Sequence, residues 1–311
     1  MQQIDIVLAS PRGFCAGVVR AIETVRLTLK KVSRPVYVLH EIVHNRHVIK
    51  ELEARGVHFV VDLSEIPEKE ICIFSAHGVS VDIEKRAERL GLVTIDATCP
   101  LVTSIHRMVE QYQQKGYEVI IIGHHGHPEV VGTAGRVTGG VHIVADTDEA
   151  ETVVVRNPEK VAYVTQTTLS QQDSAAIRAI LKKRFKHLTG PNRSNICYAT
   201  QNRQNAVQTL ARSSDLIFVV GSKNSSNSNR LKEVAVQSGC RGYLIDDYRD
   251  IDPVWLEGVH RIGITAGASA PERLVDGVLS WLNEHFVIRS IREMDGKEEK
   301  ISFRPVSIDQ Q

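Results

Sequence analysis

Three of the five cysteines occupy matching places in the sequence, each between a short apolar run and a helical pattern: Cys15 in SPRGFCAG, Cys99 in DATCPLV and Cys197 in NICYATQ. Three thiolates suit an iron–sulfur cluster, which cysteines normally hold. Because four ligands are usual, three would leave one iron open to a substrate, just as a catalytic zinc keeps a vacant position. A Cys₃His zinc site is the competing interpretation, although separations of 84 and 98 residues resemble no compact zinc motif.

The two remaining cysteines have ordinary structural settings. Cys72 lies inside the apolar run ICIF, and a lone cysteine is more often a small buried hydrophobe than a ligand. Cys240, in QSGCRG, is typical of a turn near the surface. The N-terminus MQQIDIVLAS lacks the basic and long apolar regions of a signal peptide. An odd number of cysteines without an export signal predicts reduced thiols and a cytoplasmic location.

Histidines and small polar side chains follow several of the apolar runs. His44 in HEIVHNR, His77 in FSAHGVS and His127 in IGHHGHPE are suited to bind an anion, relay protons or ligate a metal. In GSKNSSNSNR, the serines, Asn227 and backbone N–H groups predict an anion site at a helix N-terminus. TQTTLS and TAGASAP repeat this theme. No Walker P-loop and no G-x-G-x-x-G is present, so we expect no nucleotide.

The spacing of these residues indicates an internal repeat. A polar residue follows each cysteine by 29, 28 and 28 residues, at His44, His127 and Ser225. A second polar position follows by 62, 68 and 72 residues, at His77, Thr167 and Ser269. Self-similarity over such long periods is the signature of a repeated structural unit.

The surrounding elements must bring these positions together. Apolar runs typical of buried strands, such as IDIVLA, VIIIG and LIFVVG, alternate with helical patterns such as 102–115 and 174–185. This alternation predicts an α/β protein with parallel sheets, in which ligands gather beyond the carboxyl ends of the strands. We predict three pseudo-threefold-related α/β units with small parallel sheets around a central iron–sulfur cluster cavity. The predicted units are 1–96, whose first strand could pair with the third unit, 97–194 and 195–283, followed by a tail, 284–311, without identifiable chemistry.

Composition argues against two classes of partner. The 311 residues include 38 Lys and Arg against 37 Asp and Glu, and no basic run appears, so we expect no nucleic acid. The apolar runs are far too short to cross a bilayer, so we expect no membrane association.

Taken together, the motifs resemble the LytB/IspH family of 4-hydroxy-3-methylbut-2-enyl diphosphate reductases, from about Ile6 to Leu282. The resemblance rests on PRGFCAGV, HEIVHNR, FSAHGVS, DATCPLVT, GHHGHPEVVGT, TQTTLS, ICYATQNRQ, GSKNSSNSNRL and TAGASAP. It implies one [4Fe–4S] cluster on Cys15, Cys99 and Cys197, with one open iron, in a three-lobed α/β fold. It also implies the last step of the non-mevalonate isoprenoid pathway. In that step two electrons and two protons remove an allylic hydroxyl, giving isopentenyl and dimethylallyl diphosphate.

The resemblance also implies roles for individual residues. The substrate hydroxyl would bind the open iron, with Thr167 or Thr168 orienting it. Glu129 would feed protons, with His127 beside it, and ferredoxin or flavodoxin would supply electrons. The diphosphate would be held by His44, His77, His127, Ser225, Ser226, Asn227 and Ser269. From the residues alone, two other functions stay open: a non-redox iron–sulfur hydratase or dehydratase, and a non-catalytic cluster redox sensor.

Overall fold

The computed structural model describes residues 2–310, which form two compact units. The first unit comprises residues 2–16, His44–Lys50 and Tyr198–Ile301. The second comprises Gly17–Val43, Glu51–Cys197 and residues 302–310. Every strand pairing in both units is parallel. The fold is therefore α/β with several small parallel sheets, which confirms the predicted fold class.

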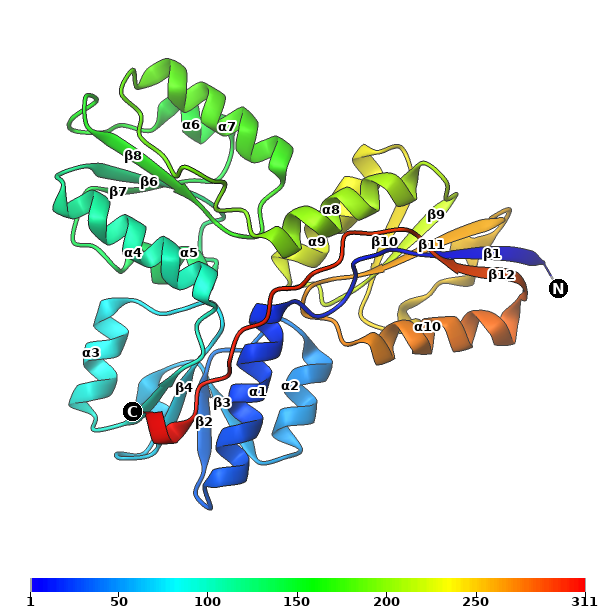
Figure 1. The fold of residues 1–311 in the computed structure, drawn as a ribbon, viewed down its shortest axis with the longest axis horizontal. Coiled ribbons are helices and arrows are strands. Elements are labelled where there is room, and N and C mark those ends of the chain that lie inside the picture. Colours follow the sequence, from blue (N-terminus) through cyan, green and yellow to red (C-terminus); the bar gives the residue numbers. More distant parts are fainter. Residues whose placement is uncertain (1, 311) are drawn as a thin grey trace. The chain divides into compact units, whose positions relative to one another are not determined.

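The first unit is built on a five-stranded sheet in the order β10-β9-β11-β1-β12. Its helices cover both faces, with α8 and α9 on one side and α10 on the other (Figure 1). Strand β9, an inner strand of this sheet, is buried at every residue, and Phe218 is fully inaccessible to solvent. The elements are β1 Gln3–Leu8, α8 Tyr198–Ala211, β9 Leu216–Val220, α9 Ser226–Gln237, β10 Arg241–Ile245, β11 Arg261–Ala266, α10 Glu272–His285 and β12 Val287–Glu293.

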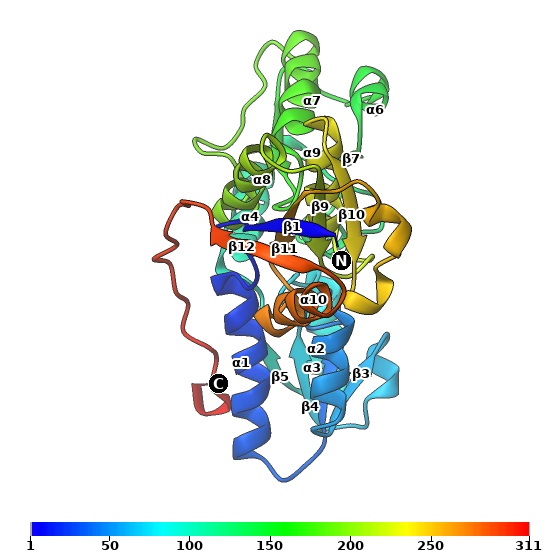
Figure 2. The same cartoon turned by 90° about the vertical axis from the view of Figure 1, so that its right-hand side faces the viewer.

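The C-terminal tail is structured, although its sequence lacks a recognisable pattern. It begins with β12, which pairs with β1 and is seen beside it in Figure 2. Farther along, residues 302–310 belong to the second unit and contact the helix α1 (Ala16–Lys31). Arg20 Nε donates to the carbonyl of Arg304 at 3.1 Å, and the Val306 amide donates to Thr24 Oγ1 at 3.0 Å.

The second unit contains two sheets, a four-stranded one in the order β3-β2-β4-β5 and a three-stranded one in the order β7-β6-β8. On the three-stranded sheet, α4 and α5 pack against one face and α6 and α7 against the other. The strands are β2 Val36–Leu39, β3 Val57–Val60, β4 Ile71–Phe74, β5 Val93–Asp96, β6 Glu118–Ile122, β7 Val141–Val144 and β8 Val161–Thr165. The further helices are α2 Arg46–Glu53, which both units share, α3 Val81–Arg89, α4 Pro100–Gln114, α5 Pro128–Ala134, α6 Thr147–Thr152 and α7 Gln171–Arg184.

The three sheets draw their strands from successive parts of the chain, except that β1 joins β11 and β12. The boundaries 1–96, 97–194 and 195–283 stay a prediction, because the division of residues 2–310 into compact units follows different limits. No helix within residues 2–310 is long and apolar enough to cross a membrane.

Candidate active site

The three cysteines of the repeat have the same backbone setting. Each immediately precedes a helix or caps it: Cys15 before α1, Cys99 at the N-cap of α4 and Cys197 before α8. Each cysteine amide donates to a carbonyl in the loop after a strand of its own unit, at 3.2, 3.0 and 3.0 Å; the acceptors are Ala268, Ala76 and Thr167 respectively. The residues directly after these acceptors are Ser269, His77 and Thr168. The repeat in the sequence is therefore also a repeat in backbone hydrogen bonding.

The cysteines outside the repeat are packed as ordinary core residues. Burial raises the pKa of the Cys72 thiol to about 12. It also raises the pKa of Cys240, whose Sγ donates to the carbonyl of Ser214 at 3.3 Å. The three repeat cysteines are instead partly exposed and form no disulfide. Three accessible thiols at loop–helix junctions fit the donor set of an iron–sulfur cluster.

The ligand candidates are distributed over both units. Cys15 belongs to the first unit, whereas Cys99 and Cys197 belong to the second. Within residues 2–310, no three His, Cys, Asp or Glu side chains meet as a metal site. The structure therefore describes the candidate active site as two sets of residues, one in each unit.

In the second unit, Glu129 and Thr167 form a tightly bonded pair. Glu129 lies in the first turn of α5, which begins at Pro128, a favoured residue at that position. Its carboxylate is only 3% exposed. Oε1 accepts from the Thr167 amide at 2.6 Å and Oε2 from the Thr167 hydroxyl at 2.7 Å. Burying a carboxylate costs free energy unless hydrogen-bond donors satisfy its oxygens, and the two donors of Thr167 do so here.

Two imidazoles lie next to this pair. The His127 ring contacts the His77 ring edge to face, with centroids 5.9 Å apart and an interplanar angle of 84°. His127 caps α5, because its Nδ1 accepts from the Glu129 amide at 3.2 Å. A neutral His127 therefore carries its hydrogen on Nε2. His77 Nδ1 lies 3.1 Å from the hydroxyl of Ser75. The second unit thus combines one buried carboxylate, one threonine hydroxyl and two imidazoles.

Two further residues of this region were missed by the sequence analysis. Gln166 Nε2 donates to Thr168 Oγ1 at 2.8 Å, and its Oε1 accepts from the His124 amide at 3.0 Å. His106 in α4 is 6% exposed and lies under Gly78, where a Cβ would come within 2.6 Å of the imidazole. Burial, reinforced by the charge of Arg136, lowers the pKa of His106 to about 4. Neither residue stands out by type or spacing in the sequence.

In the first unit, polar residues gather at the N-terminus of α9. Ser225 caps the helix by accepting from the Ser228 amide at 3.3 Å, and Ser226 is the first helical residue. Asn227 is 5% exposed, and neither polar atom of its amide has a hydrogen-bond partner among residues 2–310. A buried amide without partners is unfavourable unless a ligand satisfies it. Gly267 is required here, because a Cβ would lie 2.1 Å from Ser228 Oγ.

The other predicted residues of the first unit, Ser269 and His44, are bonded to each other. The Ser269 hydroxyl donates to the His44 carbonyl at 2.8 Å, and the Cys15 amide bonds to the residue before Ser269. Arg46 is already paired with Asp246 and Asp247, at 3.4 Å each. An anion bound here would therefore meet hydroxyl groups, an amide, an imidazole and a helix N-terminus. Arg46, the neighbouring cation, is already paired.

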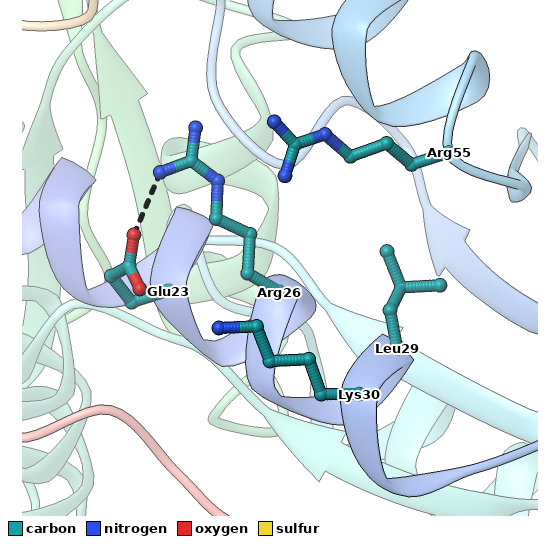
Figure 3. Close-up of a pocket in the computed structure, with 5 residues that line it drawn as sticks. All are labelled: Glu23, Arg26, Leu29, Lys30 and Arg55. Atoms are coloured by element: carbon teal, nitrogen blue, oxygen red, sulfur yellow. Dashed lines mark hydrogen bonds and ion pairs between the residues drawn. The ribbon is translucent and has the colours of Figure 1, made fainter.

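A separate hollow of about 450 Å³ lies on α1 in the second unit (Figure 3). It is lined by Glu23, Arg26, Leu29, Lys30 and Arg55. Arg26 donates to Glu23 and to Glu51, each at 2.8 Å, and Arg55 also pairs with Glu51 at 2.9 Å. Because its guanidinium groups are neutralised internally, this hollow is a poor match for a diphosphate, and none of the predicted site residues lines it.

Comparison with known proteins identifies the family. The family model described as "LytB protein" matches residues 6–283. A 4-hydroxy-3-methylbut-2-enyl diphosphate reductase from Desulfotalea psychrophila is 62% identical over 307 residues, covering 99% of this chain and 97% of the relative. One from Zymomonas mobilis is 52% identical, covering 97% and 88% respectively.

Solved structures agree with this similarity. The E-1-hydroxy-2-methyl-but-2-enyl-4-diphosphate reductase from Plasmodium falciparum superposes with a TM-score of 0.91 at 37% identity, covering 96% of this chain and 95% of that one. A second structure is described as (E)-4-hydroxy-3-methyl-but-2-enyl diphosphate reductase, the terminal enzyme of the non-mevalonate pathway. It gives a TM-score of 0.65 at 33% identity, covering 91% and 100%. The family match spans most of the chain, and these relatives align over nearly their full length. The chain belongs to the LytB protein family.

Proposed function

We propose that this chain is an iron–sulfur 4-hydroxy-3-methylbut-2-enyl diphosphate reductase, the last enzyme of the non-mevalonate isoprenoid pathway. Membership of the LytB family and the names of relatives at 48–62% identity support this function. The observation that carries it is the buried Glu129–Thr167 pair beside two imidazoles, because reductive removal of a hydroxyl needs a positioned source of protons.

The cofactor in this proposal is one [4Fe–4S] cluster held by Cys15, Cys99 and Cys197, with one iron lacking a protein ligand. The accessible thiols and their shared backbone setting support this ligand set, in contrast to the buried Cys72 and Cys240. When bound, such a cluster supplies electrons and a Lewis-acidic iron for the substrate hydroxyl. The protein supplies binding, orientation and protons.

The diphosphate is assigned to both sets of polar residues. The orphaned amide of Asn227 and the N-terminus of α9 support a phosphate position in the first unit. Imidazoles contribute donors, and their protonation matches the charge of the diphosphate. The assigned residues are His44, His77, His127, Ser225, Ser226, Asn227 and Ser269.

Protons are assigned to Glu129, with Thr167 orienting the substrate hydroxyl. By backbone hydrogen bonding, Thr168 and not Thr167 is equivalent to His77 and Ser269, but the Thr168 hydroxyl accepts from Gln166. The Thr167 hydroxyl instead bonds directly to the carboxylate at 2.7 Å, which favours Thr167 of the two. His127 orders the same turn through its bond from the Glu129 amide. Cleavage of the allylic C–O bond consumes two electrons and two protons, releases the hydroxyl as water and leaves the isopentenyl or dimethylallyl product.

The remaining assignments concern partners and location. The two electrons require a donor, and a ferredoxin or flavodoxin is proposed from the family resemblance. The substrate is a small allylic diphosphate. The cytoplasmic location likewise stays a proposal, supported by the five cysteines that form no disulfide.

Anaerobic purification tests this function directly. We expect four irons and four sulfides per chain, a cluster signal by electron paramagnetic resonance, and turnover of 4-hydroxy-3-methylbut-2-enyl diphosphate with a strong reductant. Mixing the reduced protein with substrate should oxidise the cluster. Product formation without net electron consumption would instead indicate a non-redox hydratase or dehydratase. A fully loaded cluster without any turnover would indicate a redox sensor.

A further inference from the structure

Arg203 in α8 is a charged side chain at the centre of the first unit. It is 1% exposed and lies six residues after Cys197 in the sequence. Its guanidinium donates to the carbonyl of Gly13 from Nε at 3.1 Å and from Nη2 at 2.8 Å. Nη2 also reaches the Phe14 carbonyl at 3.4 Å. A buried charge is retained only when it is paired and hydrogen-bonded. Here the acceptors include the Ala199 carbonyl, 3.0 Å from Nη1, and the carbonyls of the two residues before Cys15.

The counter-ion of Arg203 comes from the C-terminal tail. Glu299 Oε1 lies 3.0 Å and Oε2 3.2 Å from Nη1, and the Glu299 side chain is 13% exposed. Asn202 Nδ2 also donates to Oε1, at 2.9 Å. The tail is held on the same loop before it reaches Glu299. Gly296 packs so closely that a Cβ there would lie 2.2 Å from the Ser10 carbonyl.

The remaining contacts of the Cys15 loop show how completely it is fixed. The Gly13 amide donates to the Ala266 carbonyl at 3.1 Å, and Gly13 has a φ of +68°, which favours glycine. Arg12 is bound to Glu272 of α10 at 2.6 Å. The Cys15 amide is bonded to Ala268 at 3.2 Å. Two of these anchors depend on the tail for charge balance: Arg12 also pairs with Glu293 at 3.2 Å, and the buried Arg203 pairs with Glu299 at 3.0 Å.

We propose that Arg203 and Glu299 form a buried clasp that holds the Cys15 loop in its ligating conformation. The two are positioning residues, and the inference rests on the proposed role of Cys15 as a cluster ligand. Without the carboxylate, the guanidinium is left as an unpaired buried charge. It then turns toward solvent and releases the carbonyls of Gly13 and Phe14. The tail, in which the sequence analysis found no chemistry, thereby contributes to the metal site.

Glu299→Gln tests the clasp, because it keeps the shape and one acceptor while removing the charge. Glu298→Gln is the matched control, since Glu298 is 76% exposed and pairs with the exposed Lys300 at 3.2 Å. In the metal-free protein, amide hydrogen exchange of residues 13–15 should accelerate roughly ten- to a hundredfold in Glu299→Gln, the loss expected for a hydrogen bond to a charged group. Glu298→Gln should match the unmodified protein.

A second readout uses the thiols. Cys15 in metal-free Glu299→Gln should be alkylated at least tenfold faster, whereas Cys99 should react at its usual rate. In the loaded protein, iron should pass to a chelator correspondingly faster. Unchanged exchange and unchanged Cys15 alkylation in Glu299→Gln would overturn the clasp.

A second variant is needed if Glu299→Gln does not fold, and another is needed to test the ligation by Cys15 separately from the clasp. If Glu299→Gln does not fold, Asn202→Ala removes only the amide contact to Glu299. A smaller acceleration in the same residues supports the clasp, and none overturns it. If the loop loosens but Cys15→Ser still retains a full cluster, the clasp stands and the proposed ligation by Cys15 is wrong.

Discussion

Replacement of Glu129 by glutamine separates the role of this side chain in supplying a proton from its role in the local hydrogen bonding. The carboxylate accepts two bonds, at 2.6 and 2.7 Å, both from Thr167. The glutamine carbonyl can keep the bond from the Thr167 amide, and its NH₂ group can donate to the hydroxyl once that hydroxyl rotates. Because the hydrogen-bond count is preserved, we expect a loss in stability of only about 1 kcal/mol. The substitution thus removes an acidic proton without removing the local structure.

The expected kinetic effect is much larger than the effect on stability. General acid catalysis contributes roughly 10²–10⁴-fold, so Glu129→Gln should turn over at least about a hundredfold more slowly, which corresponds to about 2.7 kcal/mol. The assay is steady-state turnover under anaerobic conditions with saturating reductant, on protein with verified iron and sulfide content. Cluster content and substrate binding should be unchanged.

Glu149→Gln is the control for this experiment. Glu149 pairs with His125 at 2.9 Å, but its side chain is 39% exposed and lies on α6. It should retain normal turnover. Near-normal turnover of Glu129→Gln would refute the assignment and transfer proton delivery to a histidine, a threonine–water relay or the diphosphate of the substrate.

Three other predictions concern the cysteines, Asn227 and His106. Serine in place of any of the three proposed ligand cysteines should abolish activity and lower the iron content, whereas Cys72→Ser and Cys240→Ser should keep the iron content of the unmodified protein. Asn227→Ala should raise KM about ten- to a hundredfold with the cluster intact. Ser238→Ala, at the opposite end of α9, should leave KM unchanged; equal KM values in both variants would remove Asn227 from the phosphate site. His106 stays neutral in the folded chain down to about pH 4, whereas the unfolded chain binds a proton near pH 6.5, so stability falls as pH drops through that window. Between pH 7.5 and pH 5 this group should account for about 2 kcal/mol of lost stability, and His106→Gln should lack that part in urea titrations of metal-free protein.

The strands that the sequence missed all lie at the edges of their sheets, although two other edge strands, β5 (VTID) and β8 (VAYVT), were predicted. β9 is buried at all its residues and stands out as the run LIFVV. β3, β7, β10 and β12 went unrecognised, and all four are the outermost strands of their sheets. In β12, six of the seven residues are exposed, and its sequence VIRSIRE accordingly has no continuous apolar run. Hydrophobic periodicity predicts a strand only where the side chains of that strand are buried.

The candidate site shows a similar division. The cysteines and the polar residues after them recur at similar spacings. They could be predicted because such a repeat is visible in a single sequence. Gln166, His106 and Arg203 act through partners that are 42, 28 and 190 residues away, namely the His124 amide, Gly78 and Gly13. No local pattern marks such contacts, since they exist only after the chain has folded. The tail was set aside for the same reason.

The position of β1 in its sheet has a consequence for biosynthesis. β1 lies between β11 and β12, so residues 3–8 have no partner strand until residues 261–266 have been made. The other two sheets are complete within residues 36–96 and 118–165. Because domains fold as their strands emerge and long-range parallel pairing is slow, the nascent chain should build its middle first and its beginning last. During that interval Cys15 is an unprotected thiol on an unpaired segment, and we expect iron to be loaded only after nearly the whole chain has left the ribosome.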